Sequence, residues 1–96
     1  MPTALWIAHV EVTDPVAYAR YATGATEAIQ AHGGVFLARG GRHVQLEGRD
    51  RARDVVARFP SLEAAVACYN SPAYQDALAH AKGAALRDLM VVEEIG

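Results

Sequence analysis

The sequence predicts an α+β fold in which a four-stranded antiparallel sheet carries helices on one face. Two kinds of segment support this. Short stretches alternate apolar and polar residues at every second position, and longer stretches repeat apolar residues at intervals of three and four. Their order is strand, helix, strand, strand, helix, strand, which is the β-α-β-β-α-β pattern of ferredoxin-like domains. At 96 residues the chain is expected to form one domain, 1–96.

The first strand and helix have clear boundaries. A strand is expected at 5–12, where one wholly apolar row alternates with a row that becomes polar toward its end. The apolar row comprises Trp6, Ala8, Val10 and Val12. Asp14 and Pro15 then begin a helix that extends to about His32, because a carboxylate caps free amides and proline suits the first helical position. Its apolar stripe comprises Tyr18, Tyr21, Ala22, Ala25, Ile29 and His32.

The middle of the chain predicts two further strands. The second is expected at 35–39, after two glycines that end the helix. Beyond a glycine bend, Val44 and Leu46 continue as apolar positions that alternate with polar ones. The third strand is expected at 53–59. Its rows are Val55, Ala57 and Phe59 on one side and Asp54, Val56 and Arg58 on the other.

The last third of the chain predicts a helix that is interrupted once, followed by a strand. Ser61 is the expected cap of the first piece, and Ser71 with Pro72 restarts the helix. The buried stripe of the first piece is predicted as Leu62, Ala65, Val66 and Tyr69, and that of the second as Tyr74, Ala77, Leu78 and Ala81. A final strand is expected at 88–95.

The face of the sheet away from the helices is predicted to pair with a second copy of the chain. The wholly apolar rows of the first and third strands suit the helix-covered face. The opposite rows place His9 and Arg58 among Leu5, Ile7 and Val56, which is too much apolar surface to leave in water. A chain of this length buries only about 60–65% of its unfolded surface, so association is a common source of stability. We therefore expect a homodimer.

Composition and charge exclude several classes of protein. With 52% hydrophobic and 21% charged residues the chain is too apolar for disorder. The net charge of -2 and the lack of a clustered basic patch argue against nucleic acid as a partner. No apolar run approaches about 18 residues and no export signal is recognisable, which argues against a membrane. One cysteine, Cys68, rules out an internal disulfide, so we expect a cytoplasmic protein.

Several short motifs together resemble a known family. They are 7–15 with Tyr18 and Tyr21, then 32–34, 39–41, 46–48, 59–61 and 69–75. As a set they resemble the small bacterial domain of unknown function numbered thirteen-thirty, over nearly the whole chain. The resemblance implies a dimeric α+β barrel, in which two ferredoxin-like sheets face each other around a central cavity. It implies no established activity, because the wider superfamily includes cofactor-independent monooxygenases, isomerases, haem-dependent enzymes and members without known chemistry.

The sequence departs from that family before the third strand. Relatives often carry a tryptophan and a proline ahead of an arginine, which corresponds here to Arg53. This chain instead has the charged stretch 49–52, which is shorter. Any cavity wall that the tryptophan provides in relatives is therefore not expected here.

Five residues are candidates for a functional site. His9 on a central strand is a candidate general acid or base, or alternatively a histidine bonded across the interface or to a carboxylate. Arg58 and Arg39 are candidates for binding a carboxylate, because the guanidinium fork matches it. Arg58 would alternatively pair with a glutamate, and Arg39 would brace the glycine bend. Tyr69 and Tyr74 are candidate hydrogen-bond donors at a cavity mouth, or packed rings.

No metal or cofactor is predicted. The four histidines have no paired spacing, Cys68 is expected to be a small core residue, and the glycine pairs lack the lysine of a phosphate loop. Three functional hypotheses remain. The first is a dimeric small-molecule module whose inter-sheet cavity holds a small, partly apolar carboxylic acid. The second is a cofactor-independent monooxygenase or isomerase that acts on such an acid. The third is a structural or interaction protein with a filled interface.

Overall fold

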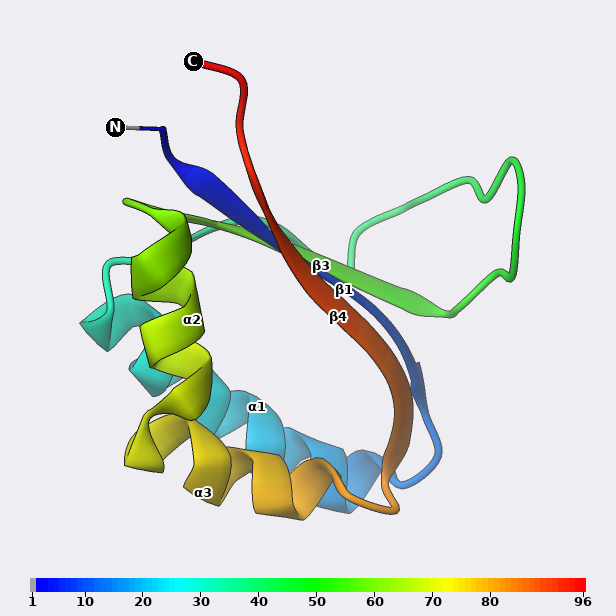
Figure 1. Cartoon of the computed structure of the whole chain (residues 1–96). Coiled ribbons are helices and arrows are strands. Elements are labelled where there is room, and N and C mark those ends of the chain that lie inside the picture. Colours follow the sequence, from blue (N-terminus) through cyan, green and yellow to red (C-terminus); the bar gives the residue numbers. More distant parts are fainter. Residues whose placement is uncertain (1) are drawn as a thin grey trace.

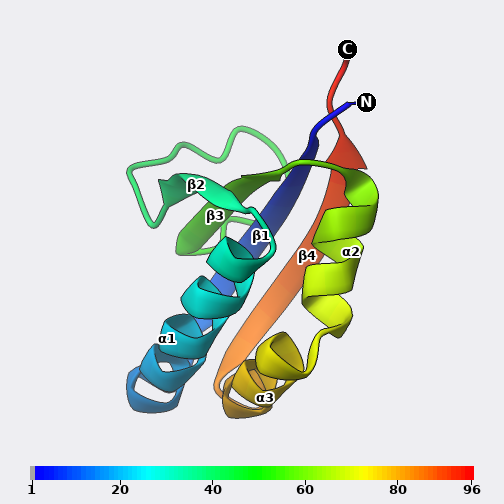
Figure 2. The same ribbon diagram turned by 90° about the vertical axis from the view of Figure 1, so that its left-hand side faces the viewer.

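The structure, a computed structural model, describes residues 2–96 and has the predicted α+β fold. Its elements are β1 (Ala4–Val12), α1 (Pro15–Ala31), β2 (Val35–Arg39), β3 (Arg53–Phe59), α2 (Leu62–Asn70), α3 (Pro72–Ala81) and β4 (Ala85–Glu93). The four strands form one antiparallel sheet in the order β2-β3-β1-β4. All three helices cover the same face, and within the described residues no helix covers the other face (Figures 1 and 2).

Local side-chain caps set where the helices begin. The Asp14 carboxylate accepts a hydrogen bond from the Ala17 amide at 3.2 Å, at the start of α1. The Ser71 hydroxyl accepts one from the Tyr74 amide at 3.2 Å, while Pro72 occupies the first turn of α3. Because Ser71 has an extended backbone, the two helices are separate, as the serine and proline predicted.

The core lies between the helices and the apolar rows of the central strands. Trp6 on β1 is 5.6 Å from Phe59 on β3 and 5.2 Å from Tyr74 on α3, measured between ring centroids. Cys68 is fully buried, as expected for a small core residue. The helix-facing rows of β1 and β3 are therefore confirmed. This arrangement leaves Leu5, Ile7 and Val56 on the opposite face.

Three sequence predictions were wrong in detail. The last strand begins at Ala85 rather than 88, because its ladder with β1 continues as far as the pair Val12–Ala85. Val44 and Leu46 do not extend a strand: they lie 81% and 87% exposed in the loop 40–52 (Figure 1). This loop contacts the sheet on the side opposite the helices, where His43 pairs with Asp54 on β3 and Arg51 with Asp88 on β4. On α2, Ala65 is buried as predicted and Cys68 is buried beside it, whereas Val66 and Tyr69 remain 45% and 38% exposed.

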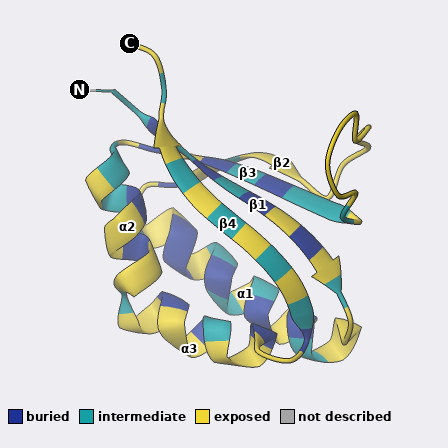
Figure 3. Ribbon diagram, turned by 45° about the vertical axis from the view of Figure 1, so that its right-hand side comes forward, coloured by how far each residue is buried: buried dark blue, intermediate teal, exposed yellow. Residues whose placement is uncertain are grey.

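The face away from the helices exposes apolar residues of the two edge strands. Along β4, exposed residues alternate with less exposed ones, as Figure 3 shows. The exposed apolar residues of β2 and β4 comprise Val35, Leu37, Leu86, Met90 and Val92. Within residues 2–96, no helix has both the length and the apolar character needed to cross a bilayer.

Candidate functional site

A cavity of about 490 Å³ lies between α1 and the sheet. Its floor is formed by small and aromatic residues of the central strands, such as Ala8 and Trp6. Its roof is formed by α1, where Tyr18 and Tyr21 stand beside Ala22 and Ala25. Since alanine occupies positions on both surfaces, the helix and the sheet leave space between them here. This volume falls in the range of small-molecule sites.

Three arginines from three different strands line this cavity. They are Arg39 on β2, Arg53 on β3 and Arg87 on β4. Arg53 and Arg87 are both partners of Val10, one on each side of β1. Strand register therefore brings these two side chains to the same level of the sheet, on the helix-covered face. Their Cα atoms lie on the order of 10 Å apart, because neighbouring strands are about 4.8 Å apart.

These arginines have no acidic partner. None of the ion pairs formed within residues 2–96 involves Arg39, Arg53 or Arg87. The Nε atoms of Arg53 and Arg87 are buried and have no hydrogen-bond partner in the part of the chain that the structure describes. Glu27 is the one acidic residue among the cavity-lining side chains. The cavity is therefore positively charged and has unused donors.

Arg39 and Arg53 are held by different neighbours. The Arg39 guanidinium lies over the Phe36 ring at 4.5 Å and donates to the Thr26 hydroxyl at 3.3 Å. Arg53, rather than Arg39, lies against the glycine bend. A Cβ atom on Gly40 would come within 2.5 Å of the Arg53 Nη1 atom, and the φ angle of +72° also favours glycine there. Gly40 thus makes room for the Arg53 guanidinium.

Arg87 joins two phenols at the inner side of the cavity. Its Nη2 atom donates to the Tyr21 hydroxyl at 2.6 Å and to the Tyr74 hydroxyl at 3.2 Å. The two hydroxyl oxygens are 2.7 Å apart. Burial raises the pKa of Tyr21 and that of Tyr74, so both phenols remain protonated at physiological pH.

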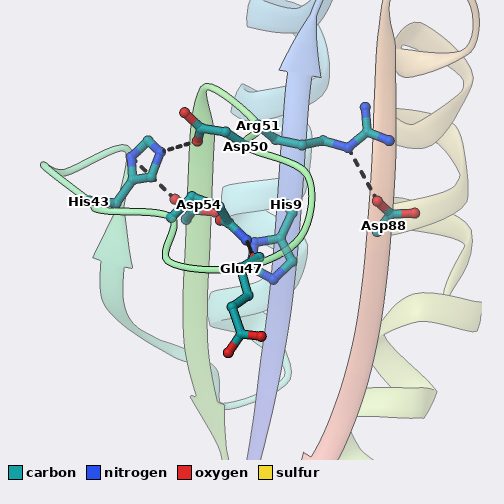
Figure 4. A network of polar contacts seen from close by, with 8 residues as sticks. His9, His43, Glu47, Asp50, Arg51, Asp54 and Asp88 are labelled. Atoms are coloured by element: carbon teal, nitrogen blue, oxygen red, sulfur yellow. Dashed lines mark hydrogen bonds and ion pairs between the residues drawn. The ribbon is translucent and has the colours of Figure 1, made fainter.

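A second polar cluster lies on the uncovered face. His9 Nδ1 and the Asp54 carboxylate are 2.6 Å apart, and His43 contacts Asp50 at 2.9 Å and Asp54 at 3.4 Å. Figure 4 shows His43 extending from the loop 40–52 toward both carboxylates. The hydrogen bond that His43 donates to the Asp50 carboxylate is the largest cause that raises the pKa of His43. Within residues 2–96, no three or more histidine, cysteine, aspartate or glutamate side chains are arranged so that they could hold a metal ion.

The predicted site residues are divided between the two faces of the sheet. His9 and Arg58 lie on the uncovered face, where Arg58 donates to both oxygens of Glu94 at 2.6 and 3.1 Å. Arg39 lines the cavity. Tyr74 is a buried ring, and its hydroxyl contacts Tyr21 and Arg87 rather than a backbone group. Tyr69 lines a separate apolar groove between α2 and β4.

Sequence reasoning missed Arg53, Arg87 and the polar role of Tyr21. The signal for Arg53 was present, because strict alternation backward from Val55 places this arginine in the apolar, helix-facing row. Arg87 was missed because the last strand was expected to begin after it. Tyr21 was interpreted as a core ring, which is correct for its burial but not for its hydroxyl.

Comparison with known proteins places the chain among small uncharacterised domains. No curated protein is significantly similar in sequence. A protein of unknown function from Rhodopseudomonas palustris, RPA0582, is 20% identical with a TM-score of 0.79, and the match covers 99% of this chain and 84% of that one. A dimeric ferredoxin-like protein of unknown function from Thermobifida fusca is 18% identical (TM-score 0.65; 97% and 92% covered).

A third similar structure is an enzyme. SnoaB, a cofactor-independent oxygenase from Streptomyces nogalater, is 8% identical with a TM-score of 0.70, and the match covers 100% of this chain and 96% of that one. Such low identities establish a shared fold and nothing about the reaction. The family assignment rests instead on the sequence: the model of a domain of unknown function, DUF1330, matches residues 3–95, and the chain belongs to this family.

Proposed function

We propose that the protein is a homodimeric, cytoplasmic small-molecule module that binds a small, partly apolar organic acid in the cavity under α1. The observation that carries this proposal is the pair of buried, unpartnered Nε donors on Arg53 and Arg87. Buried polar groups normally have hydrogen-bond partners, and a buried charge without one is costly. A carboxylate that enters the cavity would supply both the missing acceptors and the missing negative charge.

The rest of the cavity suits the apolar part of such a ligand. Trp6, Tyr18, Ile29 and Phe36 contribute apolar and aromatic surface to its walls. Pockets of this kind use a few polar groups for orientation and apolar contact for affinity. From the sequence, the ligand was expected between the sheets of two chains. The cavity under α1 needs only one chain, and we prefer it because the arginines that line it lack acidic partners.

The dimer is proposed to form through the uncovered face. Leu86, Met90 and Val92 are about half exposed on this face in the single chain, and a surface of this kind is normally covered. The Thermobifida fusca protein with the same fold is described as dimeric. Light scattering at micromolar concentration should give the mass of two chains. A well-folded species of one chain would overturn this part of the proposal.

Ligand binding is tested by calorimetry with phenylbutyrate and its neutral amide, phenylbutyramide. We expect the acid to bind more tightly, because the amide has the same apolar body without the charge. Arg53→Met should weaken binding of the acid roughly tenfold or more, since a hydrogen bond to a charged group contributes about 1.5–3 kcal/mol. Arg20→Met, which changes an exposed arginine of α1 outside the cavity, is the control.

Three outcomes of this experiment would contradict the proposal. If acid and amide bind equally, or if neither binds at millimolar concentration, the arginines do not form an anion site. If Arg58→Met abolishes binding while Arg53→Met does not, the ligand lies on the uncovered face, where the sequence analysis expected it. A dimer that binds neither compound would favour a structural or interaction role.

A second candidate function is a cofactor-independent oxygenase or isomerase with His9 as general acid or base. The hydrogen bond between His9 Nδ1 and Asp54 favours it, because a carboxylate that orients imidazole leaves Nε2 available for proton transfer. The likeness to SnoaB is consistent with this role. His9 lies on the face opposite the cavity, so such a reaction would take place between the two sheets of a dimer.

The oxygenase role is tested by dioxygen uptake. Without a cofactor the substrate itself must supply electrons, so an electron-rich dihydroxynaphthalene is the probe. We expect uptake above the uncatalysed rate in the wild-type protein and its loss in His9→Ala. Equal rates in both proteins would remove His9 from the mechanism.

A further inference from the structure

In the cluster of Tyr21, Tyr74 and Arg87, one phenol has a hydroxyl hydrogen that no other member of the cluster accepts. A guanidinium only donates, whereas each phenol has one hydrogen and two lone pairs. Arg87 donates to both hydroxyl oxygens, so it accepts a hydrogen from neither. The contact of 2.7 Å between the two oxygens uses one phenolic hydrogen. The other hydrogen must point elsewhere.

Burial decides which phenol keeps the free hydrogen. Tyr74 has no exposed surface and does not line the cavity, and its hydroxyl has no partner within residues 2–96 other than Tyr21 and Arg87. If Tyr21 donated to Tyr74, the hydrogen of Tyr74 would be enclosed without an acceptor, at a cost of about 1–3 kcal/mol. Tyr74 therefore donates to Tyr21. The hydrogen of Tyr21, which does line the cavity, is free.

The Tyr21 hydroxyl cannot accept a hydrogen bond from a ligand. Its two lone pairs are occupied, one by the hydrogen of Tyr74 and one by that of Arg87. The Tyr21 hydroxyl therefore offers the cavity a donor and no acceptor. Because burial raises the pKa of this phenol, the donor persists at physiological pH. The buried Nε of Arg87 is a second unused donor on the same residue cluster.

We propose that Tyr21 selects ligands that carry a second acceptor oxygen, a ketone or ester carbonyl, in addition to their carboxylate. This inference rests on the proposed acid-binding function and narrows it to oxo acids and their relatives. The carboxylate binds Arg53, and the carbonyl oxygen accepts from the Tyr21 hydroxyl. Since Arg53 and Arg87 stand on opposite sides of Val10, the two ligand groups are separated by several atoms rather than adjacent.

The test compares benzoylpropionate with phenylbutyrate, which have the same carbon skeleton and differ only in the ketone. Calorimetry of the full-length protein should show roughly threefold to tenfold tighter binding of the ketone, the effect of one neutral hydrogen bond. Tyr21→Phe should reduce this ratio to about one. Arg53→Met should weaken both acids and keep the ratio.

Spectroscopy provides a second readout that does not depend on affinity. With a carbon-13 label at the ketone, the carbonyl stretch of bound benzoylpropionate should move to lower frequency in wild type and not in Tyr21→Phe. An unshifted stretch in wild type, or a ratio near one before any mutation, overturns the role of Tyr21. If the ketone ratio is already near one in wild type while Arg53→Met weakens both acids, the role of Tyr21 fails and the anion site stands, so the two proposals fail separately.

Discussion

Replacing Arg53 by methionine should make the unliganded protein more stable, although it removes a charged residue from the sheet. The wild-type Nε donor is buried and has no partner, which costs about 1–3 kcal/mol. The guanidinium also repels that of Arg87. If the two charges are as far apart as the Cα atoms, on the order of 10 Å, this repulsion is about 1–2 kcal/mol at an effective dielectric constant of about 20, before screening by salt. Methionine keeps the length and apolar contact of the side chain and removes both penalties.

Part of this gain is offset, because Arg53 is only partly buried and its exposed nitrogens are hydrated in the wild type. We therefore expect a net increase of about 1–2 kcal/mol in the free energy of unfolding. For a domain of this size each kcal/mol corresponds to about 4–8 °C in the melting temperature. The gain should shrink as sodium chloride is raised, because salt screens the repulsion between the two guanidinium groups.

Thermal unfolding followed by circular dichroism checks this prediction, at one protein concentration and in a buffer free of sulfate, phosphate and carboxylates. Arg20→Met is the control and should change stability by less than about 0.5 kcal/mol. Added phenylbutyrate should stabilise wild type and not Arg53→Met. If Arg53→Met melts at or below the wild-type temperature in low salt, Arg53 has a partner in the native protein and the cavity has no need of an anion.

Three further predictions concern single features. Gly40→Ala should weaken phenylbutyrate binding in calorimetry because a Cβ atom displaces the Arg53 guanidinium, whereas Gly41→Ala, with nothing within 4 Å, should not. Burial raises the pKa of the Cys68 thiol to about 11, so at mildly alkaline pH this thiol should react with an aromatic disulfide reagent only after unfolding. The Asp50 carboxylate raises the pKa of His43 in the folded protein, so protonated His43 should stabilise the folded loop at pH values below its ordinary pKa. This stabilisation should be lost as the pH rises through the raised pKa. Proton NMR should show that Asp50→Asn lowers the pKa of His43.

Local sequence signals were sufficient for most of the fold. Asp14 and Pro15 predicted the start of α1, and Ser71 with Pro72 predicted the break between α2 and α3, because caps and proline act within a few residues. The last strand was placed three residues late, since its first residues are held by pairing with the end of β1 rather than by local preference. A ladder between distant segments leaves little trace in either segment alone.

The candidate site was harder to predict, because it depends on which face of the sheet each residue joins and on what stands opposite. His9 was expected to find a carboxylate or an interface partner, and Asp54 on the neighbouring strand is that carboxylate. Nothing in the sequence indicated that Tyr21 and Tyr74 meet. They lie on different helices, and their contact follows from the packing of α1 against α3.

Two arginines of β3 show that the partner of a side chain indicates its role better than its residue type does. Arg58 and Arg53 lie five positions apart, so strand alternation directs them to opposite faces of the sheet. Arg58 forms a bidentate pair with Glu94, which neutralises its charge. Arg53 faces the helices in an otherwise apolar row and forms no ion pair with an acidic residue among residues 2–96. An arginine in that row lowers stability unless something enters the cavity to accept its hydrogen bonds, and this unmet requirement is what directs attention to the cavity.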